Sequence, residues 1–305
     1  MKKDLISIKD LTPKEINALF SLADRLKKAK SMQPLKGKCL GLIFQKPSNR
    51  TRVSFEVGIA QLGGRAIYLR PEDVKLGSRE PAKDVARTLS RYLDGIVART
   101  FKHNDLLELA GFASVPVINA LSDLLHPCQA LSDLYTIRKK LKKLKGAKVA
   151  YIGDGNNVAN SLLYGCSKMG VNLSIASPKG YEPSREILSE SLEFASKNGS
   201  EISLISDASR AVSGADIVYT DVWTSMGQET QAGKRRQDFK NFQVNAKLLF
   251  HAKPKALVMH CLPAHRGEEI SEGVLEGPRS IVFDQAENRL HMQKAILVKL
   301  LSKMK

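Results

Sequence analysis

Long apolar runs are missing from this 305-residue sequence. A membrane-spanning helix needs about 20 consecutive apolar residues, and no stretch of the chain approaches that length. The N-terminus starts basic but meets Asp4, Lys9 and Asp10 before an apolar segment develops, which argues against a signal peptide. The sequence therefore predicts a cytoplasmic protein that has no membrane partner.

Cysteine is scarce, and the chain contains no C-x-x-C pair. The four cysteines are Cys39, Cys128, Cys166 and Cys261. Their number and separation argue against a disulfide framework and against a structural zinc site. The histidines His126, His260 and His265 also lack the spacing of metal ligands. We therefore expect no metal and no organic cofactor.

Aromatic residues make up only 6% of the chain, whereas lysine and arginine give it a net charge of +17. A field of this sign attracts anions, from nucleic acid to small phosphorylated substrates. The basic run 137–145 suggests nucleic acid, but Leu141 and Leu144 recur at helical spacing and no aromatic residue interleaves for base stacking. Such a run is more typical of a solvated helix end, so we expect no nucleic-acid partner.

Short apolar runs alternate with helical patterns along the chain. The run 39–44 is typical of a strand buried on both faces, and Thr12 followed by Pro13 and Glu15 forms a capping box that opens a helix. The predicted strands are 39–44, 66–69, 95–98, 115–118, 149–152, 173–176, 202–205, 217–220 and 257–260. The main predicted helices are 13–30, 53–62, 82–92, 105–111, 129–141, 158–169 and 285–301.

This alternation predicts an α/β fold with two doubly wound parallel-sheet domains linked by helices. We place the first domain at residues 1–142 and the second, Rossmann-like domain at residues 143–284. The remaining residues, 285–305, form a helix that we expect to pack back on the first domain.

The loop after the first predicted strand carries a group of donors suited to an anion. Ligands of parallel sheets bind beyond the carboxyl ends of the strands, and a helix N-terminus offers unpaired N–H groups and a positive dipole end. Arginine side chains add planar forks that match phosphate oxygens, and hydroxyls add further donors. The residues of this predicted anion site are Ser48, Asn49, Arg50, Thr51 and Arg52.

Two further loops of the first half follow predicted strands and carry polar side chains. Arg99 follows the strand 95–98, and His126 and Gln129 bracket the start of a helix three positions apart. We predict that all three point into the same crevice as the anion loop. There His126 would donate to a carbonyl oxygen, and Gln129 would bond to an amide.

In the second half, the turn Gly153–Asn157 joins the first strand to the first helix. It partly matches the dinucleotide fingerprint, but Val158 occupies the third glycine position, so the match is weak. Asn157, at the helix start, suits a carboxylate. After the strand 217–220, the anionic Asp221 begins a loop in which Gly227 is a candidate hinge.

Five motifs, in this order, span nearly the whole chain: Ser48–Arg52 with Phe55 and Glu56, His126–Gln129, Gly153–Asn157, Asp221–Gln228 and His260–Pro263. Together they resemble the signature set of the ornithine carbamoyltransferases. The first two motifs are shared with the aspartate carbamoyltransferases, and the last two discriminate for ornithine. The resemblance implies a carbamoyl-phosphate domain, an amino-acid domain, and a homotrimer or a multiple of trimers with shared active sites.

The activity that this resemblance implies is carbamoyl transfer from carbamoyl phosphate to the δ-amine of L-ornithine, giving L-citrulline and phosphate in arginine metabolism. The implied catalytic residues are Cys261, Arg99 and His126. The implied carbamoyl-phosphate ligands are Ser48, Asn49, Arg50, Thr51, Arg52, Lys75, Arg99, His126, Gln129, Cys261, Leu262 and Arg289. The implied ornithine ligands are Asn157 for the carboxylate, Asp221 for the α-ammonium, Ser225 and Met226.

Two positions depart from the commoner family pattern. Asn49 stands where a threonine is usual, and Lys75 replaces the glutamine or histidine that reaches carbamoyl phosphate in the neighbouring subunit. A lysine there would act on the phosphate as a point charge. The role of Cys261 stays open at this stage, since the thiol could accept the amine proton, orient the amine, or be inert.

Three alternatives to ornithine transfer remain. The first is another acceptor amine, such as putrescine or an acylated ornithine, against which Asp221 and Ser225 favour a free α-amino group. The second is aspartate, whose second carboxylate Asp221 would repel. The third is a nucleic-acid-binding protein, which would need basic residues clustered on one face together with stacking aromatics.

Overall fold

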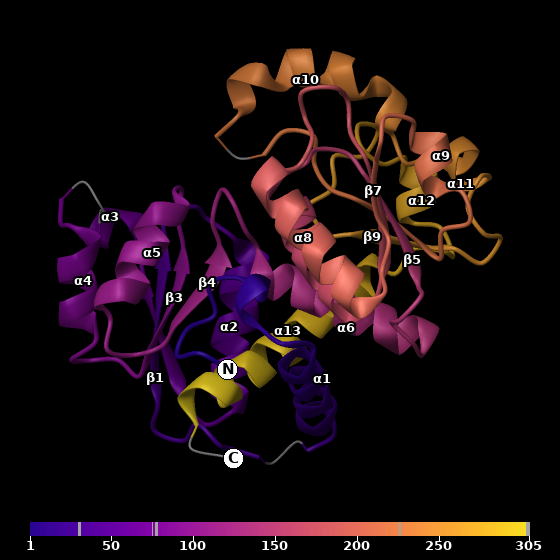
Figure 1. The fold of residues 1–305 in the computed structure, drawn as a ribbon. Helices are drawn as coiled ribbons and strands as arrows, with labels where there is room; N and C mark the ends of the chain where they lie inside the picture. Colours follow the sequence, from indigo (N-terminus) through magenta and orange to yellow (C-terminus); the bar gives the residue numbers. More distant parts are fainter. Residues whose placement is uncertain (30–31, 75, 77–78, 226, 303–305) are drawn as a thin grey trace. The chain divides into compact units, whose positions relative to one another are not determined.

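The computed structural model describes residues 1–29, 32–74, 76, 79–225 and 227–302. The chain divides into two units, Met1–Ser132 with Glu287–Lys305 and Asp133–Ala286. Each unit contains one parallel sheet flanked by helices (Figure 1), which confirms the predicted fold class. The divisions fall inside two helices, α6 (Pro127–Leu141) and α13 (Val282–Leu301), whereas the sequence placed them after residues 142 and 284.

The first unit is built on the parallel strand order β2-β1-β3-β4. Its strands are β1 (Cys39–Phe44), β2 (Arg65–Leu69), β3 (Gly95–Arg99) and β4 (Val117–Leu121). Its helices, besides parts of α6 and α13, are η1 (Ile8–Asp10), α1 (Pro13–Lys28), α2 (Asn49–Gln61), α3 (Pro71–Val74), α4 (Ala82–Leu89) and α5 (His103–Phe112). Every residue of β1 is buried, as its continuous apolar sequence predicts.

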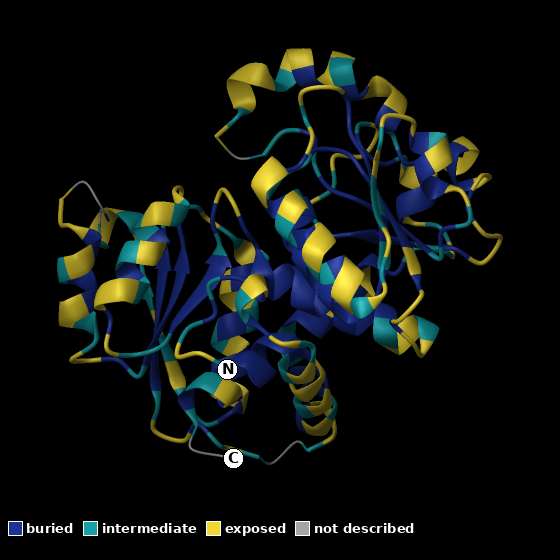
Figure 2. Cartoon of the chain, in the orientation of Figure 1, coloured by how far each residue is buried: buried dark blue, intermediate teal, exposed yellow. Residues whose placement is uncertain are grey.

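Local sequence explains where these elements begin and end. Thr12 accepts from the Glu15 N–H, and Glu15 accepts from the Thr12 N–H at 2.8 Å, so the predicted capping box opens α1. The apolar side chains of α4 and α5 pack with those of β1 and β3 in one core cluster. The strands β1 and β3 are buried throughout, whereas α4 and α5 show both buried and exposed residues (Figure 2). A Cβ on Gly95 would lie 2.9 Å from the side chain of Leu301 on α13, so the glycine allows this helix to pack closely on β3.

One predicted strand is displaced along the chain. We expected it at 115–118, but β4 covers Val117–Leu121. Pro116 has no N–H for a strand ladder, so regular pairing begins after it. Beyond the proline, β4 pairs with the N-terminal segment as well as with β3, because the Leu5 N–H donates to the Val117 carbonyl and the Asn119 N–H donates to the Leu5 carbonyl.

The second unit is built on the parallel strand order β7-β6-β5-β8-β9. Its strands are β5 (Lys148–Ile152), β6 (Asn172–Ala176), β7 (Ile202–Ile205), β8 (Ile217–Thr220) and β9 (Leu257–His260). Its helices, besides parts of α6 and α13, are α7 (Asn157–Met169), α8 (Arg185–Asn198), α9 (Ala208–Val212), η2 (Glu229–Gln231), α10 (Ala232–Phe239), η3 (Lys240–Phe242), α11 (Ala246–Leu249) and α12 (Glu272–Leu275).

The two helical layers of this unit differ in burial. Helices α9 to α12 contribute one buried side each to an apolar cluster with β5, β6, β8 and β9. Helix α7 is buried all round from Val158 to Met169, between α8 and the sheet. In the described part of the chain, no helix combines the length and the apolar composition that crossing a membrane requires.

Gly155 marks a close approach between two loops of the second unit. Its N–H donates to the Tyr181 carbonyl at 2.8 Å, and a Cβ on it would lie 2.2 Å from the Pro183 nitrogen. Backbone atoms cannot yield as a flexible side chain does, so only glycine fits there. The glycine therefore serves packing of the turn after β5 against residues 181–183.

We predict that Gly155→Ala destabilises the protein by about 1–3 kcal/mol, because an added methyl group overpacks a rigid contact. Gly233→Ala, at an exposed position of α10 in the same unit, meets nothing within 4 Å. That variant should instead gain up to about 1 kcal/mol from the better helix propensity of alanine. Urea unfolding of both variants measures the difference, and equal stabilities would contradict the packing argument.

Candidate functional site

The N-terminus of α2 in the first unit is capped by its own loop. Ser48 accepts a long hydrogen bond from the Thr51 N–H and donates its hydroxyl to Thr51 Oγ1 at 3.0 Å. Thr51 is fully buried, and its Oγ1 also accepts from Arg289 Nη2 at 2.8 Å. Arg289, from α13, therefore lies at this helix N-terminus, beside the residues predicted to hold an anion.

The other members of the predicted anion loop are more open to solvent. Arg50 is half-buried, and Asn49 and Arg52 are exposed. Arg52 donates to Glu56 at 3.0 Å, and its guanidinium carbon lies 3.8 Å from the ring centroid of Tyr68. These contacts hold Arg52 along the outer side of α2.

Arg99 and His126 are buried in the first unit, each less than a tenth exposed, and Gln129 is fully buried. Burial lowers the pKa of His126 well below its ordinary value, and the positive charges of Arg289 and then Arg99 lower it further. Its imidazole is therefore neutral near pH 7, and the two guanidinium groups are close enough to act on it. The structure thus brings together one neutral donor and two fixed cations, an arrangement that suits an anion with a carbonyl group.

Two of the implied site residues cannot be placed. Lys75 and Met226 lie outside the described residues.

Cys128 is a buried cysteine two residues after His126, and burial raises the pKa of its thiol to about 12. The thiol therefore takes no part in chemistry at His126. Its Sγ donates to the Asn119 carbonyl at 3.3 Å.

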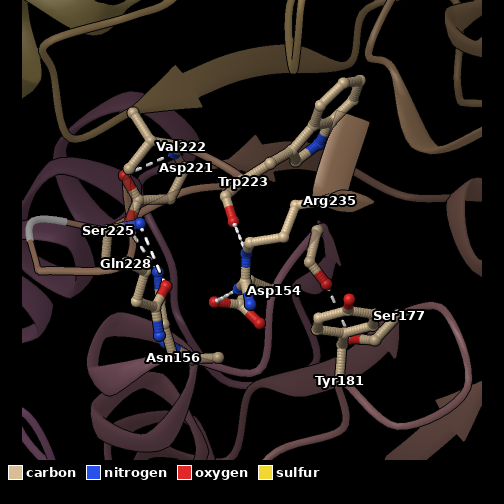
Figure 3. Close-up of polar contacts among 12 residues, drawn as sticks. Asp154, Asn156, Ser177, Tyr181, Asp221, Val222, Trp223, Ser225, Gln228 and Arg235 are labelled. Atoms are coloured by element: carbon tan, nitrogen blue, oxygen red, sulfur yellow. Dashed lines mark hydrogen bonds and ion pairs between the residues drawn. The ribbon is translucent and has the colours of Figure 1, made fainter. Parts of the chain in front are cut away.

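Asp221 is the centre of a second group of polar side chains, in the second unit. Its carboxylate accepts from Asn156 Nδ2 at 2.8 Å, from the Val222 N–H at 2.8 Å and from Cys261 Sγ at 2.9 Å (Figure 3 draws the Asn156 and Val222 bonds). The turn after β5, the end of β8 and the loop after β9 therefore meet at one carboxylate.

Asn156, which the sequence analysis did not select, is the residue that caps α7. Its Oδ1 accepts from the N–H groups of Val158 and Ala159, and its amide points to Asp221. Asn157, the predicted carboxylate ligand, is half-buried at the first position of the helix. Asn or Asp directly before a helix commonly caps it, and that rule identifies Asn156 rather than Asn157 as the cap of α7.

Arg235 is a second residue that the sequence analysis missed. It is buried, its Nε donates to the Trp223 carbonyl at 2.5 Å, and its guanidinium pairs with Asp154 (Figure 3). Its guanidinium carbon also lies 4.7 Å from the ring centroid of Tyr181. Desolvation raises the pKa of Asp154 to about 6, although Arg235 acts against this shift. One arginine thus ties α10 to the start of the loop 221–229.

That loop makes a further contact near its tip. Ser225 is half-buried, and its N–H donates to Gln228 Oε1 at 3.2 Å. Gly227 adopts a φ of 94°, a conformation that glycine accommodates without strain.

The loop after β9 carries Cys261 and Leu262 and is held by the His260 ring. His260 Nδ1 accepts from the Leu262 N–H at 2.8 Å, so Nε2 carries the proton and donates to Glu269 at 3.0 Å. Both His260 and Glu269 are fully buried. Cys261 and Leu262 are half-buried, and the Leu262–Pro263 peptide bond is cis.

Two groups of possible metal ligands occur among the described residues. One comprises Asp221, His260 and Cys261, and the other comprises the sequence neighbours His265, Glu268 and Glu269, with ligand atoms within 4.8 Å of one another in each group. Both ring nitrogens of His260 already take part in hydrogen bonds. A metal in the first group would therefore have to displace one of them.

The fold and these two side-chain groups define a two-domain α/β enzyme, in which one half gathers buried arginines and the other is centred on a buried carboxylate. Family models match nearly the whole chain: the aspartate/ornithine carbamoyltransferase carbamoyl-P binding domain over residues 3–139, and the Asp/Orn binding domain over residues 145–300. The chain therefore belongs to the aspartate/ornithine carbamoyltransferase family.

Individual relatives agree with this assignment. The chain is 53% identical over 301 residues to the ornithine carbamoyltransferase of Bacillus subtilis, covering 99% of this chain and 94% of that protein. It is 50% identical over 299 residues to the anabolic ornithine carbamoyltransferase of Pyrococcus furiosus, with coverage of 97% and 95%. A solved structure of ornithine carbamoyltransferase from Pyrococcus furiosus matches with a TM-score of 0.96 at 50% identity, covering 99% of this chain and 98% of that chain.

We predict that Arg235→Met lowers the free energy of unfolding by about 3–5 kcal/mol at pH 8, because it leaves the Asp154 carboxylate buried without its partner. The neighbouring Arg236 is 61% exposed and pairs with Glu268 at the surface, so Arg236→Met should cost less than about 1 kcal/mol. Chemical denaturation of both variants makes the comparison, and equal losses would contradict a special role for Arg235.

The loss in Arg235→Met should also shrink on acidification. A carboxyl group whose folded pKa is raised binds a proton on folding, so its contribution to stability is present below the unfolded value of 3.8 and is lost as pH rises past about 6. Removing Arg235 raises that folded pKa further. The stability difference from wild type should therefore be smaller at pH 5 than at pH 8.

Proposed function

We propose that this protein transfers the carbamoyl group of carbamoyl phosphate to the δ-amine of L-ornithine, giving L-citrulline and phosphate. The observation that carries the proposal is the neutral, buried His126 beside Arg99 and Arg289. A dianionic phosphate needs fixed cations, and a carbonyl under attack needs a donor that does not itself require charge. Membership of the family and relatives of about 50% identity support the same reaction.

In the first unit, the α2 N-terminus and its loop bind the phosphate. The backbone N–H groups at the start of α2 and the hydroxyl of Ser48 supply donors, and Arg289, already bonded to Thr51, supplies a planar fork. Arg99, His126 and Gln129 bind the carbamoyl group, with His126 donating to its carbonyl oxygen. The phosphate ligands in this proposal are Ser48, Asn49, Arg50, Thr51, Arg52, Lys75 and Arg289.

In the second unit, Asp221 pairs with the α-ammonium of ornithine and Asn157 binds its carboxylate. Ser225 and Met226 complete the contacts from the loop after β8. The carboxylate of Asp221 suits this role because hydrogen bonds from Asn156, Val222 and Cys261 hold it in one position. An ammonium group would add a charge-assisted bond to a site that needs little reorganisation.

The chemical step begins when the uncharged δ-amine attacks the carbamoyl carbon. Negative charge then develops on the carbonyl oxygen, where His126 and Arg99 stabilise it. The C–O bond to phosphate breaks, and the leaving phosphate takes up the proton that the amine loses. Cys261 and Leu262 lie at the reacting centre in this proposal. Because the Cys261 thiol donates to Asp221, we assign it an orienting role rather than that of a resting thiolate base.

The assembly and setting of the enzyme form part of the same proposal. We propose a cytoplasmic homotrimer, or a multiple of trimers, with active sites shared between subunits, in arginine biosynthesis. The similarity to a relative named as anabolic supports this direction. The net charge of +17 would also steer doubly negative carbamoyl phosphate to the protein, an effect that weakens as ionic strength rises.

The acceptor specificity can be tested by measuring the carbamoylated product formed from carbamoyl phosphate and each of ornithine, putrescine, N-acetylornithine and aspartate. We expect ornithine to exceed the others in kcat/KM by about 10⁴-fold, since a site built to bond a polar group strongly rejects analogues that lack it. Asp221→Asn should reduce that preference. Preferred use of putrescine or N-acetylornithine would point to the alternative of another acceptor amine.

The role of His126 has a separate test. His126→Ala should lower kcat by about 10²–10³-fold, the usual cost of losing one donor to a developing oxyanion. Because its pKa lies well below the ordinary value, wild-type kcat should show no inflection from this histidine between pH 6 and pH 8. His251→Ala, at an exposed position, is the control and should leave kcat unchanged. A loss of less than about threefold for His126→Ala would contradict the assigned role.

A further inference from the structure

Three side chains form a buried hydrogen-bonded cluster in the second unit that the proposed reaction does not use. Gln285 Nε2 donates to Asp133 Oδ1 at 2.8 Å and to the Tyr219 hydroxyl at 3.1 Å. Tyr219 in turn donates to Asp133 Oδ2 at 3.0 Å. All three residues are at most 1% exposed.

The free end of the Gln285 amide reaches the strand that precedes Cys261. Its Oε1 accepts from the His260 N–H at 3.0 Å. Strand β9 is at the edge of its sheet, so the N–H groups of alternate residues point outward without a neighbouring strand. The Val258 N–H donates to the Arg279 carbonyl, and the His260 N–H, two residues later, donates to Gln285. Gln285 thus takes the place of a missing strand at the last residue of β9.

The cluster touches both of the strands that position the Asp221–Cys261 contact. Tyr219 lies on β8, two residues before Asp221, and His260 immediately precedes Cys261. The two strands are neighbours, with Thr220 opposite His260. A shift of either strand end would therefore change the 2.9 Å distance between Cys261 Sγ and Asp221 Oδ1.

We propose that Gln285, oriented by Asp133 and Tyr219, is a positioning residue that sets Cys261 against Asp221. Glutamine suits the position because one end of its amide must accept from His260 while the other end must donate to Asp133 and Tyr219. A carboxylate has no N–H to donate to Asp133 and would place an acceptor against it. An apolar side chain can neither accept from His260 nor donate to Asp133. The kinetic part of this inference rests on the proposed function, whereas the positioning of the thiol does not.

The experiment compares Gln285→Met with Gln293→Met. Gln293 is a matched control, because it is a fully buried glutamine on the same helix whose side-chain atoms have no hydrogen-bond partner among the described residues. The first readout is the rate at which iodoacetamide alkylates Cys261, located by mass spectrometry. Cys261 is the half-buried cysteine, and Cys39, Cys128 and Cys166 are buried.

In Gln285→Met we expect alkylation of Cys261 to be about tenfold faster, because a thiol moved off the Asp221 carboxylate loses both its acceptor and a neighbouring negative charge. We also expect kcat for citrulline formation to fall about tenfold, as small misplacements at a reacting centre do, while the KM for carbamoyl phosphate stays within about twofold. Gln293→Met should match wild type in all three quantities. If the two variants behave alike, the cluster has only a structural role and the proposal is overturned.

A second variant keeps the inference testable if Gln285→Met does not fold. The carboxyl introduced by Gln285→Glu can replace the amide only while it is protonated, when it both accepts from His260 and donates to Asp133. Its alkylation rate, expressed as a ratio to wild type at each pH, should therefore approach one as the pH is lowered from 8 to 6. A ratio that stays well above one at every pH would overturn the proposal. Absence of citrulline formation by the wild type would overturn the proposed function alone, since the thiol comparison needs no turnover.

Discussion

The carboxylate of Asp221 is the point on which the second unit depends. Two segments far from it in the sequence donate to it through Asn156 and Cys261, and the N–H of its neighbour Val222 adds a local bond. A buried carboxylate is costly unless donors satisfy it, so these bonds are needed for stability as well as for geometry. They also fix the relative positions of the turn after β5, the end of β8 and the loop after β9. A substrate ammonium would meet a negative charge that has already been desolvated and oriented.

The first unit buries positive charge at its site, whereas the second unit buries the negative charge of Asp221. Arg99 and Arg289 are buried in a protein that is rich in lysine, and the neutral state of His126 follows first from its burial and then from the charges of these two arginines. A charged imidazole would repel both guanidinium groups. The arrangement therefore keeps His126 as a donor without a third positive charge.

Much of this could be predicted from the sequence, for identifiable reasons. Strands such as β1, β7, β8 and β9 were placed at their observed bounds, because short apolar runs bounded by polar residues leave few alternatives. Motif order along the chain indicated the family that the comparisons confirm. The strand at β4 was misplaced because a proline was counted inside an apolar run, and its pairing with Leu5 depends on a long-range contact that no local pattern records.

The residues that the sequence did not reveal influence the site by holding other residues in position. Arg235 looks like one of several basic residues on a charged helix, and only the fold shows that it alone turns inward to Asp154 and Trp223. Asn156 and Asn157 are adjacent asparagines, and only the capping geometry at the start of α7 separates their roles. Gln285 and Tyr219 carry no motif at all. Their roles arise from strand order and helix packing, which sequence periodicity does not specify.

The burial of the cysteines has a consequence for oxidative damage. Cys39, Cys128 and Cys166 are closed off from solvent, and burial raises the pKa of the Cys128 and Cys166 thiols well above the range in which a thiolate forms. Peroxides react with thiolates that they can reach. Of the four cysteines, only Cys261 is partly exposed, so an oxidant of thiols that leaves the fold intact would act first at the loop where Asp221 and Cys261 meet.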